Sequence, residues 1–386
     1  MYTVLIDLTP YSILWVTVVT CVFIVLFIFI TRMKAVISKV PMWITMSLAF
    51  IMCLRLLFPV EFLCFSKTLL SFNVFPHIND VFYADITAIN NVVPDIRLTV
   101  VNVFCFVWVS GAVVFIVNYL RKYNKLCKMI KHIAPSDDPL ITGTLNRIKA
   151  EHNFKFDVKI IVNCAIPSPS EFGFFRQVIF LNDYKYTAEE LNYILLHELT
   201  HFYNKSNWIK LFMDMVKSIL WWNPVIYMLQ KHIDNLLEIY VDTYVVRDSI
   251  AEYRLGYLEC ICNVFKRSIP LNACSAESNY VHSMAAVSNR SVLKMRYNAI
   301  CLDHRNNITA CVTAFLIILI YIFISGRYVV QPGYEPTEED MYVPEITSEN
   351  SYIVKEGDMY VLYCEGTSYL VSPDLESLPQ VPLINE

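Results

Sequence analysis

The segment 189-EELNYILLHELTHFYNKSN-207 carries the pattern His-Glu-Leu-Thr-His, in which two histidines are four residues apart. On a helix, residues at this spacing lie on one face, so His197 and His201 can bind the same metal ion. Glu198 lies beside them, where its carboxylate can accept a proton from a water molecule at the metal. A chance match on an ordinary core helix is the alternative interpretation, expected in about one chain in a hundred of this length.

The residues before this pattern predict where its helix begins. Thr187 and Glu190 have the spacing of a capping box, in which each side chain accepts a hydrogen bond from the other residue's backbone N–H. Leu191, Leu195 and Leu199 then recur at helical spacing and define an apolar face. The histidines are therefore predicted to lie on a helix, where burying them without partners would be costly.

A second helical pattern, "PVIYMLQKHIDNLLEIYVDTYVVRD" (224–248), supplies a carboxylate. Glu238 and Asp242 lie one turn apart on the same face, and their apolar neighbours favour a buried site over a solvated helix edge. A catalytic zinc site needs three protein ligands and one open position. Glu238 is therefore predicted to join His197 and His201 as the third ligand. Asp242 is predicted to accept a hydrogen bond from the second ring nitrogen of a ligating histidine.

The composition indicates a membrane protein. Hydrophobic residues make up 56% of the 386-residue chain, charged residues make up only 17%, and the mean hydropathy is +0.44. A soluble domain usually has about 25% charged residues. Four apolar runs have the length that crosses a bilayer as a helix, about 17–25 residues. The predicted spans are residues 11–30, 41–60, 98–120 and 309–325.

Basic residues predict the orientation of these spans. The first cations of the chain, Arg32, Lys34 and Lys39, follow the first span, and the basic run "RKYNKLCKMIKH" (121–132) follows the third. By the positive-inside rule, the N-terminus lies outside. Arg55, near the outer end of the second span, is either a functional residue within the membrane or, as its position favours, a residue that extends its charge to the membrane surface. The predicted regions are a membrane region 1–120 with an outside loop 61–97, a cytoplasmic domain 121–308, the fourth span 309–325 and an acidic outside tail 327–386.

Strand patterns occur in the predicted cytoplasmic domain and in the tail. The runs "VKIIVN" (158–163) and "QVIFLN" (177–182) are β-branched and apolar, as strands are. The tail segment "SYIVKEGDMYVLYCEGTSYLV" (351–371) predicts three short strands with turns at Gly357 and Gly366. The predicted fold class is a polytopic α-helical membrane protein with a cytoplasmic α+β domain and a small extracellular β tail.

Two further features leave alternatives open. The twelve cysteines are scattered without a C-x-x-C pair and are predicted to be mostly buried and reduced, while a disulfide between Cys64 and Cys364 is left open. The segment 207–224 has an apolar stripe that includes Trp208, with Lys210 on the opposite side. It is interpreted as a packing helix of the domain, as a helix at the membrane surface, or as both.

Taken together, these motifs resemble the BlaR/MecR-type membrane metallopeptidases, the antirepressor family of regulatory gluzincins. The likeness covers about residues 1–325. The stretches that carry it are "LRLLFP" (54–59), "VSGAVVFIVNYLRKY" (109–123), "SPSEFGFFRQVIFLN" (168–182), "LLHELTH" (195–201) and "WNPVIYMLQKHI" followed by "EIYVD" (222–242).

The resemblance implies a zincin-like peptidase domain with one catalytic zinc ion. His197, His201 and Glu238 would hold the zinc, Glu198 would be the general base, and Asp242 would orient a ligand. The strand with Ser168, Phe172 and Gly173 would form the rim to which an extended peptide substrate adds. Tyr240, Tyr244 and His232 are candidates for the oxyanion donor only because they are close in the sequence.

The function implied is a multi-pass plasma-membrane zinc endopeptidase that cleaves a cytoplasmic protein, itself or both in response to an outside signal. The expected substrate is a repressor of the winged-helix type, with no direct binding of nucleic acid by this chain, and a homodimer is left open. Well-known members end in a penicillin-binding sensor domain, but the tail here has no S-x-x-K motif, so β-lactam sensing is not predicted. The alternatives are a quality-control or CAAX-type zinc protease, and a non-catalytic receptor or scaffold with a structural zinc ion.

Overall fold

The structure is a computed structural model of the 386-residue chain. It forms two compact units, residues 1–70 with 77–331 and residues 71–76 with 332–386. The residues described are 6–7, 10–33, 36, 39–59, 61–62, 67–71, 74–84, 86, 99–164, 166, 168–268, 282–283, 290–301, 307–332, 351–356, 359–364, 367–371 and 383–384.

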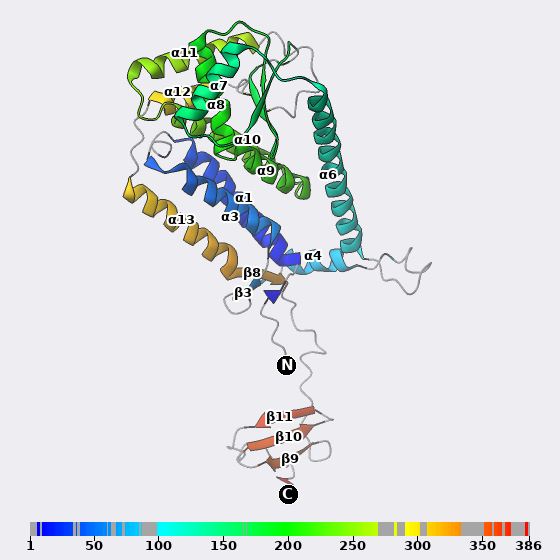
Figure 1. The fold of residues 1–386 in the computed structure, drawn as a ribbon. Coiled ribbons are helices and arrows are strands. Elements are labelled where there is room, and N and C mark those ends of the chain that lie inside the picture. The colour runs from blue at the N-terminus through cyan, green and yellow to red at the C-terminus, as the bar shows by residue number, and fades with distance from the viewer. Residues whose placement is uncertain are drawn as a thin grey trace. The chain divides into compact units, whose positions relative to one another are not determined.

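Within the described residues, three helices are long and apolar enough to cross a membrane (Figure 1). They are α1 (Pro10–Thr31), α6 (Val100–His132) and α13 (Ile308–Arg327). The span predicted at 41–60 is instead a shorter helix of 16 residues, α3 (Met42–Leu57). Prolines bound it on both sides, because Pro41 precedes its first residue and Pro59 disfavours helical backbone at the residue before it.

Helix α6 extends well beyond the predicted span 98–120. It continues to His132 through the basic run, because that run contains good helix formers and the next proline is Pro135. Two tryptophans join α6 to the C-terminal end of a later helix, α9 (Ser206–Ile219). The indole N–H of Trp108 donates to the Ile219 carbonyl at 2.6 Å, and that of Trp221 donates to the Trp108 carbonyl at 3.1 Å.

Helices α1, α3 and α13 pack against one another (Figure 1). The Thr20 and Tyr321 hydroxyls are hydrogen-bonded at 2.9 Å between α1 and α13. The Arg55 guanidinium donates to the Ser325 carbonyl at 2.7 Å in the last turn of α13, where carbonyls lack helical partners. The sequence favours an Arg55 charge that reaches the membrane surface and does not predict this hydrogen bond to α13.

The remaining helices and strands of this unit form an α+β domain. The sheet order is β4-β6-β5-β7, with β4 parallel to β6 and β5 antiparallel to both of its neighbours. The two strands predicted at 158–163 and 177–182 are confirmed as β4 and β6. The elements are α7 (Pro139–Glu151), β4 (Val158–Val162), β5 (Ser170–Phe172), β6 (Gln177–Leu181), α8 (Ala188–Tyr203), α9, α10 (Pro224–Val245), α11 (Ala251–Ser268), β7 (His282–Ser283) and α12 (Arg290–Cys301).

Two apolar clusters hold this domain in place. One lies between the sheet and helices α7, α8, α10 and α11, with Ile179, Leu195 and Val241 fully buried. The other joins α9 and α10 to α1 and α3, and includes Val216 and Met52. The domain therefore shares a core with the apolar helices.

Several short elements accompany the apolar helices. Strand β1 pairs antiparallel with β2, and β3 lies next to β8 in a second two-stranded sheet. Their bounds are β1 (Ile6–Asp7), β2 (Glu61–Phe62), β3 (Lys67–Ser71), α4 (Val74–Tyr83) and β8 (Tyr328–Pro332).

The tail contains the three-stranded meander that its sequence predicts. Strands β9 (Ser351–Glu356), β10 (Met359–Cys364) and β11 (Thr367–Val371) pair antiparallel in chain order. A fourth strand, β12 (Leu383–Ile384), pairs parallel with β9. The turns predicted at positions 357 and 366 lie outside the described residues, as does Cys64.

Candidate metal centre

Helix α8 begins as its sequence predicts. The Thr187 hydroxyl accepts a hydrogen bond from the Glu190 backbone N–H at 3.1 Å, and the Glu190 carboxylate accepts one from the Thr187 N–H at 3.3 Å. The Arg267 guanidinium of α11 also binds Glu190, at 2.9 Å. This capping box fixes the start of the helix, so His197 and His201 lie two to four turns inside it, in its most buried part.

The structure brings His197, His201 and Glu238 together. The two Nε2 atoms are 3.2 Å apart, and the Glu238 carboxylate oxygens lie 3.5 Å from the His197 Nε2 and 3.4 Å from the His201 Nε2. Zinc ligands at about 2.0–2.2 Å in tetrahedral geometry are roughly 3.3–3.5 Å from one another. The two Glu238 distances involve different carboxylate oxygens, and one donor atom from each of the three residues lies within 4.8 Å of the others. The three side chains are therefore close enough together to be ligands of one ion.

The chemistry of these donors also fits a cation. All three side chains are buried, and one Glu238 oxygen accepts no hydrogen bond from the described residues, although the Arg296 guanidinium lies 3.3 Å from it. Burial lowers the pKa of His197, but hydrogen bonds to Asp242 and Glu238 outweigh it and raise this pKa to about 9. The carboxylates thus stabilise a positive charge at this point, which a bound metal ion would supply in place of the proton.

Asp242, predicted to orient a ligating histidine, lies on the His197 side of the cluster. Its Oδ1 atom is 3.4 Å from the His197 Nδ1, and the Tyr257 hydroxyl lies 2.7 Å from each of these two atoms. The Arg296 guanidinium donates to both Asp242 oxygens, at 2.6 and 2.7 Å. Aspartate, tyrosine and arginine therefore form one buried network behind the imidazole.

Sequence reasoning missed Tyr257 and Arg296, which lie on α11 and α12. One signal was available for the arginine. Leu293, Arg296 and Ile300 occur at positions i, i+3 and i+7, so the charge lies on the apolar face of its helix. A charged residue on that face requires a buried counter-charge.

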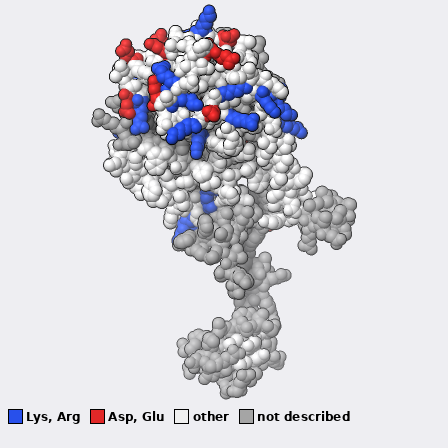
Figure 2. Space-filling model, viewed as in Figure 1, with Lys and Arg blue, Asp and Glu red and all other residues white. Residues whose placement is uncertain are grey.

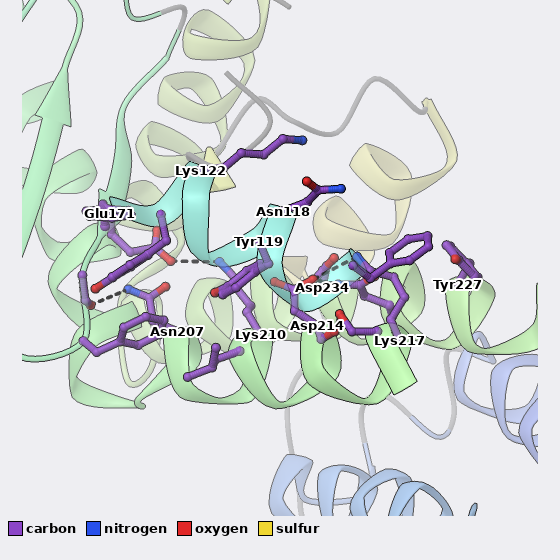
Figure 3. Close-up of a pocket in the computed structure, with 18 residues that line it drawn as sticks. Asn118, Tyr119, Lys122, Glu171, Asn207, Lys210, Asp214, Lys217, Tyr227 and Asp234 are labelled. Carbon is purple, nitrogen blue, oxygen red and sulfur yellow. Dashed lines mark hydrogen bonds and ion pairs between the residues drawn. The ribbon is translucent and has the colours of Figure 1, made fainter. Parts of the chain in front are cut away.

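A second ion pair lies on the His201 side, and its two residues line a cavity of about 540 Å³ formed by α6, β5, α9 and α10 (Figure 3). The Lys210 ammonium donates to the Glu171 carboxylate at 2.8 Å, and this carboxylate lies 4.0 Å from the His201 Nδ1. Both charged side chains are at most 3% exposed. Each histidine therefore has a carboxylate behind it that is itself paired with a cation.

The segment predicted at 207–224 as a packing helix, a membrane-surface helix or both forms α9, and its most buried face differs from its apolar stripe. The membrane-surface interpretation of the stripe stays a prediction. Lys210, predicted opposite that stripe, is buried together with Met213 and Val216, whereas Trp208 is 42% exposed. The reason is that the Glu171 carboxylate pairs with the ammonium, which makes burial of Lys210 possible.

Glu198 is buried on α8 between the two histidines in the sequence. Neither of its carboxylate oxygens has a hydrogen-bond partner within the described residues. Burial raises its pKa well above the ordinary value, and the nearby charge of Glu171 raises this pKa further. A divalent cation bound nearby would lower the pKa of this carboxyl group, which would leave it ionised and able to accept a proton.

The three rim residues predicted for substrate binding, Ser168, Phe172 and Gly173, differ from one another in their surroundings. Phe172 packs against Tyr123 of α6 in a small apolar cluster, and Ser168 is buried. Gly173 has a φ of 103°, where a Cβ atom would lie 2.0 Å from the Arg176 carbonyl oxygen. Its own carbonyl accepts a hydrogen bond from the Asn207 side chain at 3.1 Å (Figure 3). It also lines a smaller cavity, of about 240 Å³, beside His201.

The outer edge of β5 is paired with another segment of the chain. Ser170 is opposite Ser283 and Glu171 is opposite His282, in an antiparallel arrangement. This edge of β5 is thus occupied by β7 of the same chain, and the binding of an extended peptide substrate there stays a prediction.

The structure does not place the oxyanion candidates against the metal cluster. The His232 ring is hydrogen-bonded to the Thr31 hydroxyl of α1 at 2.6 Å. Tyr244 packs against the rings of Tyr203 and His152. Tyr240 is half-buried on α10. The contacts among the described residues therefore support none of these three candidates.

Comparisons with known proteins agree with these motifs. The family model described as BlaR1 peptidase M56 matches residues 7–300. The Regulatory protein BlaR1 of Bacillus licheniformis is 28% identical over 187 residues, which cover 47% of this chain and 31% of that protein. The Regulatory protein BlaR1 of Staphylococcus aureus is 21% identical over 289 residues, 69% of this chain and 48% of that protein.

The matches thus cover 31% and 48% of the length of these two curated relatives, less than half of each. The family model, by contrast, matches most of this chain. The matched residues include the apolar helices α1, α3 and α6 as well as α8, α10 and most of α12. The chain therefore belongs to the BlaR1 peptidase M56 family of metallopeptidases, as its motifs predict.

Proposed function

We propose that the protein is a membrane-embedded zinc endopeptidase that cleaves a cytoplasmic regulatory protein, itself or both, in response to a signal from outside. The observation that carries this proposal is the spacing of 3.2–3.5 Å among the donor atoms of His197, His201 and Glu238. Two imidazoles and one carboxylate form a ligand set of catalytic zinc, which leaves one position open for reaction.

The proposed chemistry is metal-assisted hydrolysis of a peptide bond. Zinc, when bound, lowers the pKa of water and polarises a carbonyl group. Glu198 would accept the proton of the attacking water and pass it to the nitrogen of the leaving peptide. Tyr257 and Asp242 would hold the His197 ring so that its Nε2 atom faces the ion, and Glu171 would do the same for His201.

A protein substrate is supported by the edge of β5. Residues 282–283 of this chain already pair with that edge in the register Glu171–His282. A peptide bound as an added strand uses the same backbone hydrogen bonds. We therefore infer that the substrate binds extended along β5, and that a segment of the chain itself is one such substrate. A repressor-type protein would be the other, as the family membership suggests.

The proposed location is the plasma membrane, with the N-terminus and the tail outside and the α+β domain in the cytoplasm. Figure 2 supports this orientation, since the described charged side chains gather over the α+β domain and the adjoining end of α6. The surface over α1, α3 and α13 is mostly uncharged in the same view. Cations at the end of a span are typical of the cytoplasmic side.

Replacing Glu238 by glutamine is expected to remove most of the bound zinc. A neutral amide is a poor zinc ligand. Loss of a residue that only hydrogen-bonds to a ligand lowers metal affinity by roughly 10- to 100-fold, and loss of the ligand itself should lower the affinity further. The measurement is metal analysis of the purified full chain after equilibration with zinc. Glu252→Gln, at an exposed position of α11, is the matched control. Equal zinc in the Glu238 variant and the unmodified chain would contradict the proposed ligand.

A reporter enzyme that is active only outside the cytoplasm tests the orientation. Fused after residue 268, it should be inactive, and fused after residue 386 it should be active. The reason is that these positions would lie on opposite sides of α13. An active reporter at residue 268 would place the metal centre outside and remove the cytoplasmic substrate.

A further inference from the structure

Arg296 is among the largest fully buried side chains of the described residues, with 1% of its surface exposed. It lies on α12 and reaches across to two carboxylates on one face of α10. Its guanidinium donates to both oxygens of Asp242, at 2.6 and 2.7 Å, and lies 3.3 Å from a Glu238 oxygen. The arginine therefore contacts a proposed zinc ligand and the residue that orients another.

Helix α12 depends strongly on this contact for its position. It has 12 residues, a length at which an isolated helix is marginal in water. Among its described side chains, Arg296, Ala299 and Ile300 are the buried ones. Alanine contributes little apolar area, so the forked ion pair acts together with Ile300 and the partly buried Leu293 in attaching α12 to the domain.

The contact also fixes the geometry of the metal centre. A guanidinium that binds a carboxylate with two parallel hydrogen bonds allows only one orientation of that carboxylate. Asp242 held in this way receives the Tyr257 hydroxyl at 2.7 Å, and this hydroxyl lies 2.7 Å from the His197 Nδ1. Displacement of α12 would release Asp242, and through it the ring of His197, as well as the Glu238 carboxylate.

We propose that Arg296 is a positioning residue that couples zinc binding to the docking of α12 on α10. The inference rests on the proposed function and adds a regulatory element to the same site. In the sequence, α12 comes after β7, the edge strand of the sheet, and before α13. The first residue of α13 follows the last residue of α12 by seven positions. Either neighbour can therefore change the metal centre by moving α12. By thermodynamic reciprocity, zinc binding must also hold α12 in place.

Arg296→Lys tests the positioning role without changing the charge at the site. Lysine keeps the positive charge but lacks the planar fork that binds both Asp242 oxygens. The affinity for zinc, measured on the full chain in detergent by competition with a chromogenic chelator, should fall about 10- to 100-fold. Arg267→Lys is the matched control, because it alters another partly buried arginine–carboxylate pair, with Glu190, outside the triad. This control should bind zinc as the unmodified chain does.

Hydrogen exchange of the backbone amides at residues 290–301 supplies a second measurement that does not depend on activity. In the unmodified chain, added zinc should slow exchange in this helix. In the Arg296→Lys variant the slowing should be lost, while the helix of His197 still responds to zinc at a higher concentration. Non-additive effects of Arg296→Lys and Asp242→Asn on the affinity would show that the arginine acts through the aspartate.

The outcomes separate this inference from the proposed function. If the unmodified chain binds no zinc, the proposed function fails. If the chain binds zinc, and Arg296→Lys binds it equally well with the same zinc-dependent exchange at residues 290–301, Arg296 only fills space and the coupling is overturned.

Discussion

Replacing Glu198 by glutamine is expected to abolish peptide cleavage and to leave the metal ion bound. Glutamine has nearly the same shape as glutamate but cannot accept a proton, and Glu198 is not among the three clustered donors. Loss of a general base costs about 10²- to 10⁴-fold in rate. Two quantities are measured: the zinc content of the purified full chain, and the rate at which fragments of the chain or of fluorescently labelled casein appear.

The matched control is Glu189→Gln, an exposed glutamate in the first turn of the same helix. It should leave both zinc content and cleavage unchanged. Zinc retained together with undiminished cleavage in Glu198→Gln would contradict the base assignment. No cleavage by the unmodified chain, despite bound zinc, would instead favour a receptor or scaffold with a structural metal ion.

Deletion of the tail distinguishes the regulatory protease from a quality-control protease. A quality-control enzyme has no need of an outside module, so removal of residues 333–386 should leave its cleavage rate unchanged. The regulatory proposal expects the rate to lose its response to the signal. The tail strands β9–β12 belong to the second compact unit, whereas the α+β domain belongs to the first.

Local patterns in the sequence were sufficient to locate α8 and the cluster on it. The capping box at Thr187 and Glu190 depends on residues three positions apart, and both of its hydrogen bonds are present. The alignment of Glu238 with the two histidines could also be inferred, because a carboxylate on the apolar face of a helix indicates a buried partner. The capping box and the histidine pair follow from spacing along α8, whereas the choice of Glu238 also uses the need of a zinc site for a third ligand.

The residues that sequence reasoning missed depend on contacts between distant elements. Lys210 is buried only because Glu171 comes from a strand 39 positions earlier, and Arg296 only because Asp242 lies 54 positions earlier. Hydropathy treats both cations as exposed, since it evaluates each residue without its partner. A charged residue on the apolar face of its own helix, such as Arg296, indicates that a buried counter-charge lies nearby.

Replacing Lys210 by methionine is expected to destabilise the α+β domain substantially. The substitution keeps an unbranched apolar side chain but leaves the Glu171 carboxylate, which is 2% exposed, without its cation. Removing one partner of a buried ion pair costs about 3–5 kcal/mol. The measurement is the midpoint of thermal unfolding of the full chain in detergent, which should fall. Zinc affinity should fall as well, because Glu171 lies 4.0 Å from His201.

The double variant Glu171→Gln with Lys210→Met separates the pair from the lysine alone. With both charges removed, no buried charge of this pair is left without a partner, so most of the lost stability should return. Zinc affinity should stay low, since the amide at position 171 cannot support the imidazole as a carboxylate does. Lys217→Met is the matched control, because its partner Asp214 is less buried and the ion pair lies within a single helix. Equal unfolding midpoints for Lys210→Met and Lys217→Met would show that burial of the Glu171–Lys210 pair contributes nothing to the stability of the site.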